Sequence, residues 1–131
     1  MERIMLYVED TPGMAATAAW ALRLAKGMSC RVFALSVINP DAPRRRDAQT
    51  SDAEERAWSQ LYEIEDDAFQ KNVRISLLLE TGDPLQKLVS LSTSYDAELV
   101  VASADCRLTC SELVRQSSRP VVFVKQSMEV R

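Results

Sequence analysis

Short apolar runs alternate with longer amphipathic stretches along the chain, and this alternation constrains the fold more than any other feature of the sequence. It is typical of a parallel sheet covered by helices. A chain of 131 residues can bury one core and is too short for two ordinary domains, so we expect a single domain over residues 1–131. The apolar runs predict five strands, at 3–8, 31–38, 73–79, 99–102 and 120–125.

Start and stop signals predict helices between these strands. Thr11-Pro12 supplies an N-cap and a first helical residue for a helix that runs to about Lys26 and stops at Gly27. Asp83-Pro84 starts a later helix, and Thr109 with Glu112 forms a capping box for a short one. Each strand is therefore followed by a helix until the last.

A further helix is predicted from about Ser51 to Lys71, where Ser51 and Glu54 form a capping box. Apolar and aromatic side chains recur along it near one face, which we expect to pack on the sheet. These side chains are Trp58, Leu61, Tyr62, Ala68 and Phe69. Trp20 in the first helix is likewise expected to pack on the sheet or to contact a partner.

The chain contains no histidine, which excludes Ser-His-Asp and Cys-His nucleophile systems, a histidine general base and mixed Cys/His zinc sites. We therefore expect no enzymatic activity, no catalytic residue and no metal site. The net charge of -3 does not favour binding to nucleic acid or to an anionic membrane. No apolar segment approaches the length of a membrane span, and three cysteines without a secretory signal fit a cytoplasmic protein.

Three segments, which together span most of the chain, resemble the universal stress proteins. Residues 4–38 read IMLYVEDTPGMAATAAWALRLAKGMSCRVFALSVI and resemble the first β-α-β unit of that family, with Glu9 where the family usually has Asp. Residues 78–103 read LLETGDPLQKLVSLSTSYDAELVVAS and contain the Gly-Asp-Pro turn that starts a helix. Residues 119–125, RPVVFVK, resemble the final strand.

The resemblance implies the fold in more detail. It implies an α/β three-layer sandwich with a five-stranded parallel sheet of order 3-2-1-4-5 and helices on both faces, Rossmann-like and similar to adenine nucleotide alpha hydrolases. It also implies a homodimer formed through the last strand. The residues expected at that interface are Val121, Val122, Phe123 and Val124, because apolar edge strands invite pairing.

The loop after the fourth strand departs from the family pattern. Nucleotide-binding members have a glycine-rich loop there, whereas this chain reads SADCRLT over 103–109, with Ser103 and Cys106 in the places of two glycines. A phosphate cradle needs backbone N–H groups in turns that glycine adopts without steric cost. Asp105 adds like-charge repulsion. The sequence therefore predicts that ATP is not bound and that no cofactor is held.

A residual pocket is expected beyond the carboxyl ends of the strands, between the first and fourth strands of the resembled fold. We favour helix capping for Asp10 and Thr11, and ordinary loop or cap roles for Ser103 and Asp105, over ligand contact. The full set of pocket candidates is Glu9, Asp10, Thr11, Ile38, Ser103, Asp105 and Arg107.

Two other groups have open alternatives. Arg44–Arg46 is interpreted as a solvated loop, with an anionic ligand clamp or a nucleic-acid contact as the alternatives. Cys106 and Cys110 are four residues apart, and we interpret them as small buried residues, with a redox-sensing thiol near Arg107 as the alternative.

The sequence thus predicts a regulatory or stress-response module that is dimeric, does not bind ATP and contacts an unknown protein partner. The alternative is an adenine-nucleotide-binding member with a degenerate phosphate loop. A receiver-like signalling domain is a third class, because Glu9-Asp10, Ser103 and Lys125 fit its plan. The receiver plan fails at Glu80, where aspartate is required, and in the lack of a helix-length segment after Lys125.

Overall fold

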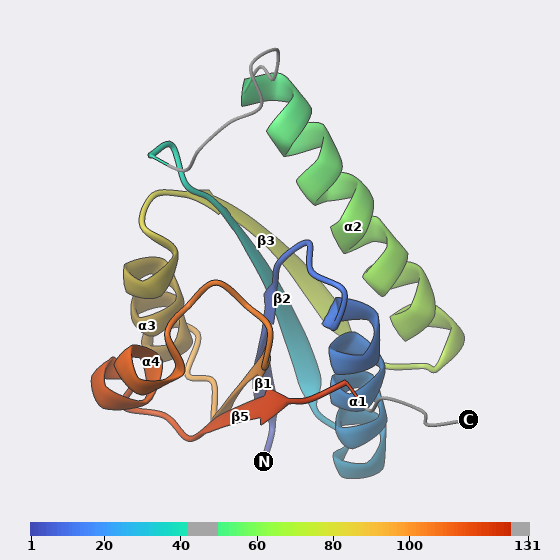
Figure 1. Cartoon of the computed structure of the whole chain (residues 1–131). Helices are drawn as coiled ribbons and strands as arrows, with labels where there is room; N and C mark the ends of the chain where they lie inside the picture. The colour runs from blue at the N-terminus through green and yellow to red at the C-terminus, as the bar shows by residue number, and fades with distance from the viewer. Residues whose placement is uncertain (42–49, 127–131) are drawn as a thin grey trace, which may run out of the picture.

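The structure, a computed structural model, describes residues 1–41 and 50–126 (Figure 1). Its strands are β1 (Arg3–Val8), β2 (Arg31–Ile38), β3 (Ile75–Thr81), β4 (Leu99–Ser103) and β5 (Val121–Val124). Its helices are α1 (Met14–Met28), α2 (Thr50–Gln70), α3 (Pro84–Ser94) and α4 (Cys110–Gln116). The predicted alternation of strands and helices is confirmed.

The five strands form one parallel sheet in the order β3-β2-β1-β4-β5, as the resemblance implied. Strand β1 pairs with β2 from Arg3 opposite Arg31 to Val8 opposite Ser36, and with β4 over Ile4–Leu6. The strand order therefore reverses between β1 and β4, where open α/β sheets place their ligands. A receiver domain has the order 2-1-3-4-5, so the sheet does not fit that class.

Helices cover both faces of the sheet and make three layers (Figure 1). Alternate strand residues point to opposite faces, so Leu6 packs with the cluster of α1 and α2, and Met5 packs with the cluster of α3 and α4. Both side chains are fully buried. The predicted α/β sandwich is confirmed, and no described helix is long and apolar enough to cross a bilayer.

The boundaries of α1 differ from the prediction at both ends. Gly13 holds the N-cap position, and no side chain of the preceding segment caps the helix. Thr11 lies in a turn, where its carbonyl accepts from the Met14 N–H at 3.1 Å. Gly27 lies inside the helix, which ends at Ser29 in a left-handed conformation with φ 55°. The Cys30 N–H donates to the Ala25 carbonyl and completes this end.

The later boundaries are mixed. Asp83 caps α3 as predicted, because its carboxylate accepts from the Gln86 N–H at 3.0 Å. The capping box of Thr109 is wrong, since its side chain makes no cap hydrogen bond. Strand β3 begins two residues later than predicted, because Val73 is buried in the turn that precedes it.

Helix α2 is where the predicted packing face is partly wrong. Leu61 and Ala68 are fully buried and Trp58 packs against the core, as expected. Tyr62 is 52% exposed and Phe69 is 82% exposed, because both lie on a flank of the helix rather than on its core face. The capping box at Ser51 and the loop of Arg44–Arg46 lie outside the side chains that the structure describes.

Candidate functional site

An open cleft of about 940 Å³ lies beyond the carboxyl ends of β1 and β2. Its walls come from α2, the start of α3 and the turn between β4 and α4. Four of the predicted pocket residues line it: Glu9, Asp10, Ile38 and Arg107. The other three, which are Thr11, Ser103 and Asp105, are not among its lining residues.

Glu9 joins the end of β1 to the turn after β4. Its Oε2 accepts from the Arg107 backbone N–H at 2.7 Å, and its Oε1 lies 4.0 Å from Arg107 Nε. Gln60 of α2 donates to the Glu9 carbonyl at 3.2 Å. Burial raises the pKa of the Glu9 carboxyl, and the bond from Arg107 opposes that rise. Glu9 therefore connects the end of β1 both to the turn after β4 and to α2.

Asp105 occupies the amino end of α1. Its Oδ2 accepts from the Gly13 N–H at 2.8 Å, and its Oδ1 accepts from the Ser103 hydroxyl. The hydrogen bond from Ser103 lowers the pKa of Asp105, so this carboxylate is charged at neutral pH. A carboxylate at a helix amino end is favoured by the backbone N–H groups and by the helix dipole.

Gly13 allows this close approach. A Cβ at this position would lie 2.6 Å from Ser103 Oγ and 2.9 and 3.0 Å from the two carboxylate oxygens of Asp105. The predicted cap role of Asp10 and Thr11 is wrong, since no side chain of that segment caps α1 and Asp105 takes the position instead. Sequence reasoning missed Gly13, although a glycine directly before a helix was visible in the Thr-Pro-Gly run.

The cleft is mainly acidic. Five carboxylates line it, from Glu9, Asp10, Asp41, Glu63 and Asp83, against two guanidinium groups, from Arg56 and Arg107. Tyr7 also lines it, and burial raises the pKa of that phenol, so the hydroxyl stays neutral at physiological pH. An acidic lining disfavours a ligand that carries several negative charges.

The cysteines have three different environments. Cys30 is buried, Cys106 is half-buried and Cys110 is exposed at the start of α4. Burial raises the pKa of the Cys106 thiol, which makes it a weaker nucleophile at neutral pH. The interpretation of Cys110 as a buried residue is wrong.

The strand order, the helices on both faces and the cleft at the carboxyl edge define a Rossmann-like three-layer α/β protein. The model of the universal stress protein family matches residues 1–125. The chain belongs to this family. No significant match was found among curated protein sequences.

Solved structures of universal stress proteins share this fold. One from Burkholderia pseudomallei has a TM-score of 0.75 at 19% identity and covers 94% of this chain and 95% of its own. One from Arabidopsis thaliana with AMP bound has a TM-score of 0.76 at 14% identity, with 97% and 93% covered. One from Archaeoglobus fulgidus in complex with dAMP has a TM-score of 0.74 at 15% identity, with 94% and 97% covered.

Proposed function

We propose that this protein is a cytoplasmic, non-enzymatic stress-response module that does not bind ATP and acts through dimerisation and protein contacts. The observation that carries the proposal is the hydrogen bond from the Gly13 N–H to Asp105. The backbone donor at the amino end of α1 is taken by the chain's own carboxylate. A phosphate at this place would have to displace a charged side chain that is already paired.

The loop between β4 and α4 supports the same conclusion. It consists of residues 104–109, and none of them is glycine. Its Arg107 N–H donates to Glu9 and its Cys106 N–H donates to the Ser103 carbonyl at 3.1 Å. Backbone donors that are already paired do not form the open nest that binds phosphate oxygens.

Strand β5 supports the proposed dimer. It lies at the edge of the sheet, and its four residues are all half-buried. The Pro120 carbonyl accepts from the N–H of Val100 in β4, and the Val124 carbonyl accepts from the N–H of Ala104 directly after β4, both at 2.9 Å. Since backbone groups alternate in direction, those of Val121 and Phe123 point to the free edge, where a second copy can pair.

The cleft supports a second candidate, an adenine-nucleotide-binding protein. Its volume of about 940 Å³ is ample for a nucleoside, and relatives of the same fold were solved with AMP and with dAMP. The acidic lining and the Asp105 contact favour the first proposal over this one.

Calorimetric titration with ATP and AMP, with and without magnesium, separates the two candidates. We expect no saturable heat with ATP up to about 1 mM ligand, and no rise in the melting temperature beyond that of a salt control. Adenosine is titrated alongside, because a ligand without phosphate distinguishes exclusion of phosphate from a cleft that holds no nucleoside. Micromolar binding of ATP would overturn the proposal and favour the second candidate.

A further inference from the structure

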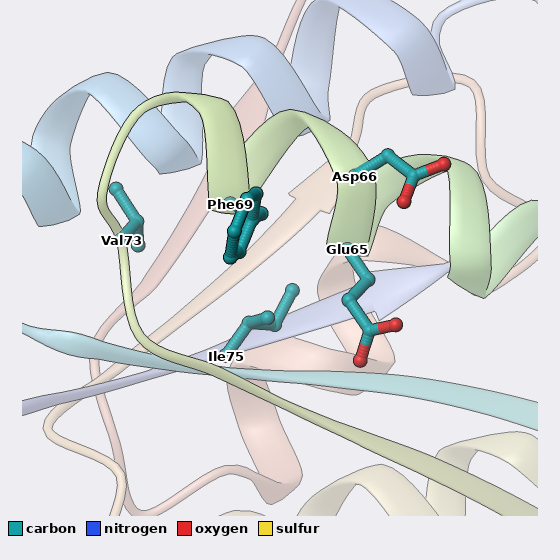
Figure 2. Close-up of a pocket in the computed structure, with 5 residues that line it drawn as sticks. All are labelled: Glu65, Asp66, Phe69, Val73 and Ile75. Atoms are coloured by element: carbon teal, nitrogen blue, oxygen red, sulfur yellow. The ribbon is translucent and has the colours of Figure 1, made fainter.

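A groove lies between the outer flank of α2 and the start of β3. Strand β3 is the last strand of the sheet and pairs only with β2 among the described residues. A hollow of about 330 Å³ lies at the start of the strand, lined by Glu65, Asp66, Phe69, Val73 and Ile75. Figure 2 shows the Phe69 ring above the Ile75 side chain, and the Glu65 side chain extending from the helix toward the strand.

The outer backbone groups of β3 are available for pairing. The Val32 N–H donates to the Arg74 carbonyl at 2.9 Å, and the Gly82 N–H donates to the Ile38 carbonyl at 3.0 Å. These two bonds show that the backbone groups of the even-numbered residues of β3 face β2. The odd-numbered residues between Arg74 and Gly82 therefore direct their N–H and C=O groups away from β2. These residues are Ile75, Leu77, Leu79 and Thr81. Strand β3 has no proline, so nothing in its sequence blocks an added strand.

The α2 side of this edge is apolar and aromatic. Ile75, Leu77 and Leu79 pack against the core cluster beneath α2. Phe69 is 82% exposed at the same flank, and Tyr62 lies two turns earlier, stacked on Trp58 with ring centroids 5.6 Å apart. An added strand would bring alternate side chains beside these groups, and apolar ones would cover the exposed ring of Phe69.

The negative charge of the groove favours a positively charged partner. Helix α2 carries seven carboxylates and one arginine, whereas the net charge of the whole chain is -3. Glu65 and Asp66 line the groove itself. Two guanidinium groups near the start of β3 are directed elsewhere, because Arg31 donates to Ser76 Oγ on the opposite face and Arg74 donates to the Ser29 carbonyl. Lysine or arginine side chains therefore complement this flank.

A second copy of the chain fits this edge poorly. Antiparallel pairing of two β3 strands in one continuous sheet would set two α2 helices side by side. Each helix has a large surplus of carboxylates, so the two would repel each other. The free edge of β5 carries no comparable acidic helix beside it.

We propose that the groove of β3 and α2 binds an extended basic segment of a partner protein by strand addition. The partner backbone pairs with the outer groups of Ile75, Leu77 and Leu79. Its apolar side chains contact Phe69, and its lysine or arginine side chains pair with Glu65 and Asp66. This inference rests on the proposed function as a protein-contact module and names the chemical class of the partner.

Fluorescence anisotropy with a labelled peptide of alternating lysine and valine tests the proposal on the full chain. We expect saturable binding, and at least about tenfold weaker binding by the variant Glu65→Lys with Asp66→Lys. The variant Glu54→Lys with Glu55→Lys is the matched control, because it makes the same charge change at exposed positions of α2 outside the groove. The loss of peptide affinity in this control variant is expected to stay below about threefold.

Several outcomes overturn the proposal. Absence of saturable binding does so, as does an equal loss in both charge variants. Equal binding of a peptide of alternating glutamate and valine also does so. Phe69→Ser supplies a readout that is independent of charge. We expect this variant to bind the lysine peptide about tenfold more weakly and to remain folded, since the ring is exposed.

Two further measurements separate the remaining possibilities. A loss of molecular mass in Phe69→Ser by light scattering would identify a second copy as the occupant and reject the basic peptide. The nucleotide titration reports on a different part of the molecule. Binding of ATP together with intact peptide binding would refute the proposed lack of ATP binding and would support the peptide site at the groove. Failure of peptide binding alone would refute only the groove.

Discussion

The backbone N–H of Gly13 donates to Asp105 Oδ2 over 2.8 Å, and this bond joins the amino end of α1 to the loop after β4. The two residues are 92 positions apart in the chain. Ser103 donates to the other oxygen of the same carboxylate. Asp105 therefore places a carboxylate of the chain itself at the amino end of α1, beside the switch point of the sheet.

Replacing Gly13 by alanine tests how tight this contact is. The added Cβ would lie 2.6 Å from Ser103 Oγ, so the loop has to move and the bond to Asp105 is strained or lost. We expect Gly13→Ala to lower the free energy of unfolding by about 1–2 kcal/mol in urea denaturation.

Gly27 offers the matched control for that variant. It lies within α1, and a Cβ there would meet no atom within 4 Å. Gly27→Ala is therefore expected to raise the free energy of unfolding by about 0.5 kcal/mol, because alanine favours the helix. Equal stabilisation by both substitutions would show that the approach of Asp105 to Gly13 is not close in solution.

The charge of Asp105 predicts a pH dependence. The hydrogen bond from Ser103 lowers the pKa of this carboxyl in the folded state, so the folded protein binds fewer protons than the unfolded chain between the two pKa values. The stabilisation is therefore present at neutral pH and is lost as the pH falls below roughly 4. We expect Asp105→Asn to be less stable than the parent protein at pH 7, and the difference in free energy of unfolding to close in acid. A constant difference across this range would contradict the prediction.

Glu9 is predicted to titrate in the opposite direction. Burial raises its pKa in the folded state, so its contribution to stability falls as the pH rises through the carboxyl range. The Arg107 guanidinium opposes the rise. We expect Arg107→Ala to raise the pKa of Glu9 further, measured by carbon NMR of the carboxyl group, and Arg107→Lys to restore most of the difference. An unchanged Glu9 pKa in Arg107→Ala would show that the guanidinium does not act on this carboxyl.

The positions of the strands were predictable because local apolar patterns determine them. Strands β1 and β2 match their apolar runs residue by residue, and the resemblance supplied the order. The Gly13–Asp105 bond was not predictable, because it depends on how two loops 92 residues apart meet. The exposure of Phe69 was missed for a related reason. An apolar residue at helical spacing fits either the core face or a flank, and only the position of β3 decides between them.

The edge of β5 gives the last prediction. The backbone N–H of Phe123 points to the free edge, so proline at this position removes a donor needed by a partner strand without removing a bond to β4. We expect the parent protein to be a dimer by light scattering and Phe123→Pro to be a monomer with an unchanged circular dichroism spectrum. Phe123→Ala is the control, because it also loses the side chain that packs against the core but keeps the N–H. A dimer that survives Phe123→Pro would reject this edge as the interface, because proline leaves a carbonyl of the partner strand without its donor.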